Sequence, residues 1–417
     1  MTRLAVNAVP SVLDVAGFAT HYTSEVIRCL DAILPDLPRV LPRLLEAVHG
    51  DRSTIYLLGN GGSSAIARTL ALAAMNIAES AGRGVRWVGA WEPHRIAAES
   101  TVHGYDAAAA GLLRRDGADH RDLVVLISGS GNSRNLIAVA QHCHQHSIPL
   151  ITLTGRTGGA LAAFDPHGLR IDSIDQQVIE DVAHAAGLTL LHQLVAAQAL
   201  DDNAASDVVE RSRPELVKAL TISQPWLQSL CESTAVAAAR GGRIVVLAPD
   251  GGGVSLSAEH TAHNLRWDLR HDNSRARLRV VDGTSLCDDT GMGNDTGTCG
   301  LAAARLLDDV TSEDLVLIFA DDPDHPAVRP ARGAAHAATT NGTSVFGCYR
   351  TGKTSDPHET AWHSGIHGPH AALTAQTLGH LLLRGVRAAT LLLNDDHSRD
   401  PHTVWQSVAP QNVRPLP

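Results

Sequence analysis

The 417-residue sequence predicts an α/β protein of two domains in tandem, each a parallel sheet flanked by helices in a three-layer αβα, flavodoxin-like arrangement. First, short apolar runs that end in loops of small residues alternate with Ala-rich helical segments, as in parallel sheets covered by helices. Second, the same order of landmarks recurs in the second half, shifted by about 190 residues. Third, Pro214 interrupts a helical pattern near the middle, which sets the predicted domains at 1–212 and 213–417.

Three apolar runs in the first half are predicted to be strands: residues 54–58, 123–127 and 149–153. The first run ends in Gly-Asn-Gly-Gly-Ser (59–63) and the second in Ser-Gly-Ser-Gly-Asn-Ser (128–133). A helix that carries His184 and His192 closes this half. In such sheets ligands bind at the carboxyl ends of the strands, which is where both loops fall.

The second half repeats the order with strands predicted at residues 243–247, 315–319 and 344–348, followed by a helix that carries His380. Where the first half has its serine-rich loop, the second half has Asp321, Asp322 and Asp324. Carboxylates there would repel a phosphate, since like charges about 4 Å apart cost on the order of several kcal/mol when partly buried. We therefore expect a degenerate second domain that does not hold phosphate.

Composition excludes several classes of protein. The formal net charge of −10 gives no attraction to nucleic acid or to an anionic membrane. The six cysteines are single, which favours neither a zinc ribbon nor a disulfide framework. The single cysteines also predict a reduced, cytoplasmic protein, and the sequence contains no apolar run of about 18 residues and no signal-peptide pattern.

The loop at 128–133 has the chemistry of an anion site. Small residues let the backbone approach a phosphate, and serine hydroxyls and free helix N–H groups can donate to its oxygens. The loop contains no cation before Arg134, which fits a phosphate monoester held by neutral donors. The alternative is a tight turn with a serine N-cap, and the presence of two such loops favours the anion site.

These loops resemble the SIS (sugar isomerase) family, most closely its phosphoheptose isomerase branch. The motifs are GNGGSS at 59–64, ISGSGNS at 127–133 and LTGRTGGALA at 153–162, and the resemblance covers most of residues 18–200. It implies a phosphate held by Ser63, Ser128, Ser130 and Ser133, to which we add Asn60 and Asn132 of the same loops. In the second half, the segment 293–297 is similar to an Asn-Asp-x-Gly loop of that branch. Asp295 would then position a sugar hydroxyl, unless the segment is simply an Asn-Asp turn.

The resemblance also implies a Glu on the first helix and a His on the last helix as acid and base. Ala73 and Asn264 stand where the Glu would be in the two halves. His380 and His192 match the closing-helix His, and His260 matches a zinc-ligand His of some members. The implied metal set is His260, His263 and His380 holding zinc, and the alternative is that no metal is required. For any single one of the 23 histidines, a surface or core role is the simpler interpretation.

The prediction is a phosphosugar isomerase resembling sedoheptulose 7-phosphate isomerase, with one working site and one degenerate site between the halves. Such an enzyme would serve heptose biosynthesis, for a cell-surface polysaccharide or a secondary metabolite. Its partner would be a small sugar phosphate, without nucleic acid or membrane, and the tandem chain would form a homodimer. The alternatives are a non-catalytic phosphosugar sensor, favoured by the missing Glu, and a pseudoenzyme that partners an active subunit.

Overall fold

The computed structural model describes residues 14–50, 53–81, 85–198, 204–249, 252–271, 279–282, 310–320, 322–326, 328–339, 344–350, 359–366 and 370–394. Contacts divide the chain into two compact units. The N-terminal unit is Ser24–Val217, and the C-terminal unit combines the described residues up to Thr23 with those from Lys218 onward. The divisions fall inside helices α1 (Val15–Ile33) and α8 (Ala204–Leu220).

The helix break predicted at Pro214 is wrong, because α8 continues through this residue. A proline inside a helix removes one backbone hydrogen bond and costs about 3 kcal/mol, which a helix can tolerate when its other contacts compensate. The predicted domain limits at 212 and 213 stay a prediction.

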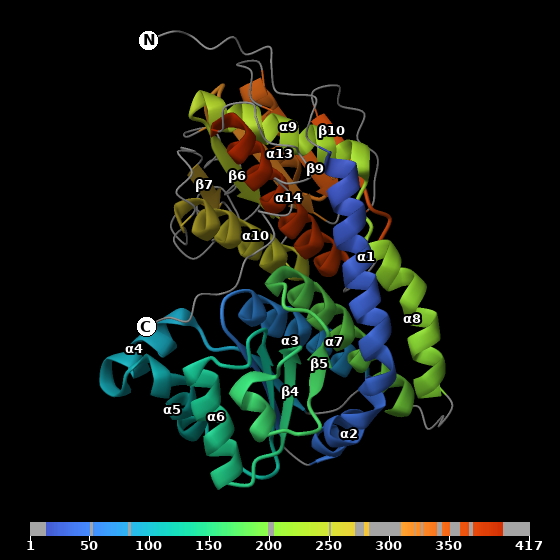
Figure 1. The fold of residues 1–417 in the computed structure, drawn as a ribbon, viewed down its shortest axis with the longest axis vertical. Helices are drawn as coiled ribbons and strands as arrows, with labels where there is room; N and C mark the ends of the chain where they lie inside the picture. Colours follow the sequence, from blue (N-terminus) through green and yellow to red (C-terminus); the bar gives the residue numbers. More distant parts are fainter. Residues whose placement is uncertain are drawn as a thin grey trace. The chain divides into compact units, whose positions relative to one another are not determined.

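A five-stranded parallel sheet forms the centre of the N-terminal unit (Figure 1). Its strands lie in the order β2 (Arg86–Gly89), β1 (Thr54–Gly59), β3 (Leu123–Ser128), β4 (Leu150–Gly155) and β5 (Leu169–Ile171). The helices of this unit are α2 (Leu41–His49), α3 (Gly62–Ala81), α4 (Pro93–His103), α5 (Tyr105–Arg115), α6 (Arg134–Gln145) and α7 (Gln176–Gln198), with the short turns η1 (Leu34–Arg39) and η2 (Gly159–Ala163).

Alternate residues of β1 pack on the two faces of this sheet. Tyr56 and Leu58 join an apolar cluster with residues of α5 and α6. Leu57 points to the other face, where it lines a small apolar cavity together with Leu70 of α3 and Leu191 of α7. Both faces of the sheet are therefore covered by helices, which gives the predicted three layers.

The C-terminal unit contains a second parallel sheet in the order β10 (Glu359–His363), β9 (Ser344–Tyr349), β8 (Leu315–Ala320), β6 (Arg243–Leu247) and β7 (Arg279–Asp282). Besides parts of α1 and α8, the described helices of this unit include α9 (Gln224–Arg240), α10 (Gly252–His271), α13 (Val328–Thr339) and α14 (His370–Asn394), and α10 packs against α14. Counted along the chain, both units have the strand order 2-1-3-4-5. The predicted α/β fold with parallel sheets flanked by helices is confirmed, whereas descent by duplication stays a prediction.

Within the part of the chain that the structure describes, no helix combines the length and the apolar character needed to cross a membrane.

Candidate functional site

The two serine-containing loops of the N-terminal unit lie at one edge of its sheet. β1 and β3 are hydrogen-bonded neighbours that run in parallel, so the loops that follow them emerge side by side. Ser63 lies in the first turn of α3 and Ser128 ends β3, and both are buried. Ser133 precedes α6 and is half-buried, whereas Ser130 is exposed.

Hydrogen bonds inside the loop after β3 hold its hydroxyl groups in place. Ser128 Oγ accepts a bond from the Gly131 N–H at 3.2 Å and lies 3.5 Å from Ser133 Oγ. Ser130 Oγ accepts from the Asn132 N–H at 3.1 Å. The side chain of Asn132 faces the next loop, where its Oδ1 accepts from the Ala160 N–H at 2.9 Å. Asn132 is thus engaged in joining two loops, in addition to any part it has in binding.

Ser133 occupies the N-cap position of α6, but its hydroxyl makes no capping hydrogen bond. A simple N-cap would place this oxygen on an N–H group of the first helical turn. Its side chain lies beside Ser128 instead. This arrangement favours an anion site over the tight-turn interpretation, because free N–H groups at a helix N-terminus attract negative charge.

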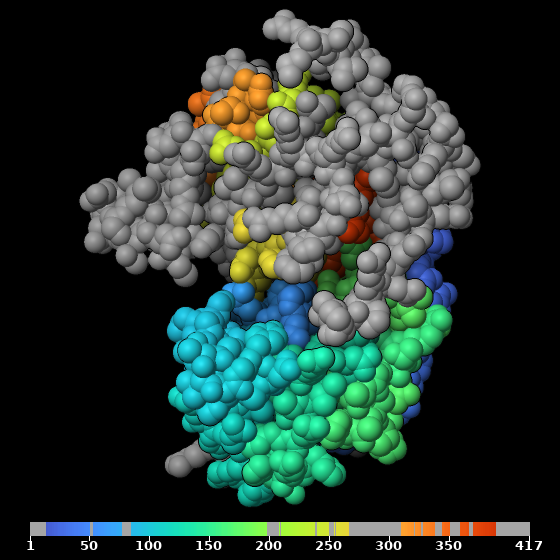
Figure 2. Space-filling view, turned by 60° about the vertical axis from the view of Figure 1, so that its left-hand side comes forward, coloured from blue at the N-terminus to red at the C-terminus, as the bar shows by residue number. Residues whose placement is uncertain are grey.

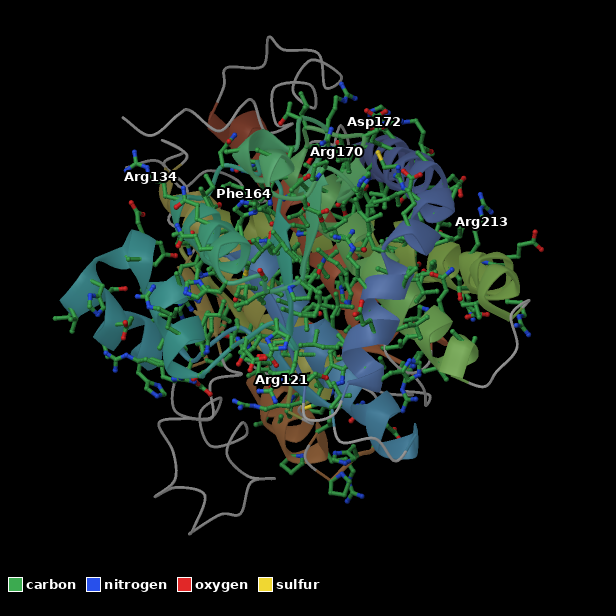
Figure 3. All side chains as sticks on the ribbon, turned by 90° about the horizontal axis from the view of Figure 1, so that it is seen from below. Arg121, Arg134, Phe164, Arg170, Asp172 and Arg213 are labelled. Carbon is green, nitrogen blue, oxygen red and sulfur yellow. The ribbon has the colours of Figure 1, made fainter. Side chains whose placement is uncertain are left out.

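No cation of this loop points into it. Arg134, the first residue of α6, projects outward in Figure 3, and its side chain is 74% exposed. It forms an ion pair with Asp106 at 3.7 Å. The donors within the loop 128–133 itself are therefore neutral groups.

Two glycines allow this loop to approach the loop after β4. Gly131 has φ +65°, and a Cβ there would fall 2.0 Å from the Gly158 carbonyl oxygen. Gly159 has φ +54°, and a Cβ there would fall 2.4 Å from the Ser130 carbonyl oxygen. Residues with side chains fit neither the backbone conformation nor the space.

Helix α7 contributes two polar side chains that lie against the glycine loops. A Cβ on Gly129 would fall 2.0 Å from Gln176 Oε1, and a Cβ on Gly62 would fall 2.4 Å from both carboxylate oxygens of Glu180. Gln176 Nε2 donates to Glu180 Oε1 at 2.8 Å. Glu180 is only 6% exposed, so the edge that carries the serines also carries a buried carboxylate.

Sequence reasoning missed Glu180 because it expected the carboxylate on α3, where Ala73 is a buried apolar residue. Gln176 and Glu180 lie four residues apart at the start of a helix that follows a strand. This spacing could have indicated two polar side chains on one helix face near the loops. His192 lies further along α7, where burial lowers its pKa. His184, nearer the loops along the helix, is fully buried.

Asn60 makes a reciprocal amide pair with Asn135 of α6. Asn60 Nδ2 donates to Asn135 Oδ1 at 2.9 Å, and Asn135 Nδ2 donates to Asn60 Oδ1 at 2.8 Å. The pair ties the loop after β1 to the start of α6. Asn60, predicted to bind phosphate, is thus held in one orientation beside the serine loops.

The C-terminal unit brings together two of the three predicted metal ligands. His260 of α10 and His380 of α14 are both buried, and their Nε2 atoms lie 3.3 Å apart. Asn264 Nδ2 lies 2.9 Å from His260 Nε2, and the Tyr22 hydroxyl lies 3.3 Å from His380 Nδ1. His263 is exposed, in contrast to the buried pair.

The geometry of the His260–His380 pair is compatible with two kinds of chemistry. In a proton-sharing chain, the Tyr22 hydroxyl donates to His380 Nδ1, and His380 Nε2–H donates to His260 Nε2. Alternatively, both Nε2 atoms can face a metal ion. Two nitrogens bound to a tetrahedral zinc at about 2.0–2.1 Å lie about 3.3 Å apart, which is the separation observed. The donor atoms therefore fit zinc in type and spacing, although the described residues of this unit supply two ligands.

Some of the predicted site residues lie outside the part of the chain that the structure describes. Asp295 and the segment 293–297 lie outside the described residues. So does Asp321, whereas Asp322 and Asp324 follow β8 at the carboxyl edge of the second sheet. The prediction that the two units serve one common site stays a prediction.

Comparison with known proteins identifies the family. The SIS domain model matches residues 21–155. Phosphoheptose isomerases of Halorhodospira halophila and Thiobacillus denitrificans are each 30% identical to this chain, over 32% and 34% of its length and 67% and 73% of theirs. The structure of tagatose-6-phosphate ketose/aldose isomerase from Escherichia coli shares the fold, with a TM-score of 0.55, 15% identity, and coverage of 95% of this chain and 97% of that chain.

The match over residues 21–155 includes both serine-containing loops, at 59–64 and 127–133. The chain belongs to the SIS domain family and has phosphoheptose isomerases among its homologues.

Proposed function

We propose that this chain is a phosphosugar isomerase that interconverts an aldose phosphate and its ketose phosphate. The observation that carries the proposal is the carboxyl edge of the first sheet. Hydroxyls of Ser63, Ser128 and Ser133 lie there on two adjacent loops, and the buried carboxylate of Glu180 lies against the first of them. An anion site and a base at one edge are the two components that this reaction requires.

In this proposal the serine loops hold the phosphate and Glu180 moves the proton. The carboxylate takes the proton from the carbon next to the sugar carbonyl, which leaves an enediolate, and gives it back to the former carbonyl carbon. The hydroxyl proton passes between the two oxygens, so that the new carbonyl forms at the neighbouring carbon. No oxidant or reductant is consumed. The hydrogen bond from Gln176 orients Glu180, so a carboxylate on α7 takes the role that Ala73 on α3 cannot.

The His260–His380 pair is the proposed place for a zinc ion, if one is used. A bound zinc would act as a Lewis acid that polarises a carbonyl oxygen. The chain's own contribution is to hold the two imidazoles with their Nε2 atoms 3.3 Å apart, supported by Tyr22 and Asn264. Metal content of the purified protein and of a His260→Ala variant tests whether the pair retains zinc.

Turnover tests the proposed function. Sedoheptulose 7-phosphate is the first substrate to try, since the sequence relatives are phosphoheptose isomerases. We expect turnover by the purified protein that falls by about 100-fold or more in Glu180→Gln, because a positioned base contributes on the order of 10² to 10⁴ in rate. Binding of the substrate should persist in that variant. Full activity of Glu180→Gln would exclude this residue as the base.

A phosphosugar sensor is the second candidate function. The observation that favours it is the replacement of the family carboxylate by Ala73 and Asn264 in the two units. A sensor would bind the same phosphosugar saturably and would leave it unchanged.

A further inference from the structure

A pocket of about 580 Å³ lies beside the serine loops in the N-terminal unit. The end of β1, the start of α6 and the hairpin of α4 and α5 line it. In sheets of this strand order ligands bind at the carboxyl ends of β1 and β3, where the segments that follow the two strands leave in opposite directions. The pocket borders both of these segments. Its size is that of a small-molecule site. Helices α4 and α5 form the cyan surface of this unit in Figure 2.

The polar groups of this pocket are few and largely engaged with one another. Among the described lining residues none is charged. The amides of Asn60 and Asn135 pair with each other, and the Ser100 hydroxyl donates to the Ile96 carbonyl oxygen at 2.6 Å. A buried hydroxyl left without a partner costs about 1–3 kcal/mol. The pocket is therefore poorly suited to an extended polyol chain with hydroxyls on every side.

The walls of the pocket are apolar and partly aromatic. Trp91 and Tyr105 line it together with Pro93, Ile96 and Ala97 of α4. The indole N–H of Trp91 is bonded to Asp116 Oδ2 at 2.9 Å, which fixes the ring. Tyr105 is 55% exposed, and its hydroxyl donates to Asn60 Oδ1 at 3.4 Å. The chain contains only 6 Trp and 4 Tyr, so two of these at one pocket mark a specific surface.

We infer that this pocket binds the body of the phosphosugar in its ring-closed form, with the apolar C–H face of the ring against Trp91 and Tyr105. The inference rests on the proposed function, because the serine loops must hold the phosphate of the same molecule. A closed ring gathers its C–H groups on one face, which suits an aromatic wall, and its hydroxyls lie around the ring edge rather than on every side as in an extended chain. The ring form is thus selected on binding, before any proton transfer.

Two non-reacting probes separate ring from chain. The first is a 1,5-anhydrohexitol 6-phosphate, which is locked as a ring, and the second is the open-chain hexitol 6-phosphate of the same stereochemistry. Calorimetry with wild-type protein should give a dissociation constant about tenfold lower for the ring-locked probe, since aromatic packing contributes about 0.5–1.5 kcal/mol. Inorganic phosphate should compete with both probes.

Variants at the aromatic wall test the cause of the preference. Trp91→Leu removes the aromatic plane, and Tyr105→Ala tests the same wall at an exposed residue. Either variant should reduce the ring preference severalfold while inorganic phosphate still binds. Trp87→Leu is the matched control, because Trp87 is similarly buried and lines the apolar cavity bounded by α2, α3 and α7. Its ring preference should equal that of the wild type.

The outcomes distinguish this inference from the proposed function. Equal affinity for the two probes, or a ring preference unchanged in both wall variants, overturns the ring-binding inference and leaves phosphate binding by the serine loops intact. Failure of phosphate and of both probes to bind the folded wild-type protein overturns the proposed function as well.

Discussion

At the residue scale, the proposed anion site relies on serine hydroxyls rather than on cations. Spacing within one loop made Ser128, Ser130 and Ser133 predictable, because residues a few positions apart after a buried strand must share its carboxyl end. Glu180 was not predictable in this way. Its closeness to Gly62 depends on how α7 packs against α3, and that contact joins parts of the chain far apart in sequence.

Loss of one serine hydroxyl should weaken phosphate binding without unfolding the protein. Ser130 is exposed, so Ser130→Ala should leave the melting temperature nearly unchanged. The dissociation constant for inorganic phosphate should rise by about 10- to 100-fold, since a hydrogen bond to a charged group contributes about 1.5–3 kcal/mol. Thr101→Ala is the control, because Thr101 is also exposed and its hydroxyl bonds within α4. Equal affinity in the two variants would remove Ser130 from the site.

At the element scale, the long buried strands were predictable and the short edge strands were not. The predicted runs 243–247 and 123–127 agree with β6 and, within one residue, with β3. The sequence did not predict β2 and β5, because β2 has four residues, β5 has three, and both lie at the edges of the sheet. An edge strand buries fewer side chains and shows no continuous apolar run.

The close contact between the loops after β3 and β4 predicts that Gly131→Ala destabilises the protein more than Gly61→Ala, whose residue lies outside that contact. Gly61→Ala meets only the strain of its φ of +53°, because nothing lies within 4 Å of the new Cβ, and should cost about 1–2 kcal/mol. Gly131→Ala has the same strain and also meets the Gly158 carbonyl oxygen, which should add about 1–3 kcal/mol. Denaturant unfolding measures both. Equal destabilisation would mean that the two loops separate without cost.

His142 of helix α6 should lower the free energy of unfolding in mild acid. Burial, with a smaller contribution from His146 and Arg114, lowers the pKa of His142. His142 therefore binds a proton less readily in the folded state than in the unfolded state. The contribution of neutral His142 to the free energy of unfolding is complete above the unfolded pKa of about 6.5 and is lost as the pH falls below that value. His142→Gln should flatten the pH dependence of unfolding below pH 6.5, where one proton contributes at most about 1.4 kcal/mol per pH unit. The exposed His144→Gln serves as control, and identical slopes in the two variants would contradict this account.

At the scale of the whole molecule, the proposed anion site of neutral donors belongs to a chain of net charge −10. Salt screens the repulsion between this charge and a phosphate, because the Debye length falls from about 30 Å at 0.01 M to about 8 Å at 0.15 M. Phosphosugar affinity should therefore hold or rise over this range, and titrations at the two ionic strengths measure it. A steep loss of affinity would show that cations bind the phosphate.

Deuterium exchange at C1 and C2 of sedoheptulose 7-phosphate, followed by NMR in deuterated water, tests the proposed isomerase most directly. It detects the proton transfer itself, even where net conversion is small. We expect exchange with the wild-type protein and its loss in Glu180→Gln, with phosphosugar binding retained in both. Saturable binding by the wild-type protein without any exchange would contradict the isomerase proposal and support the sensor.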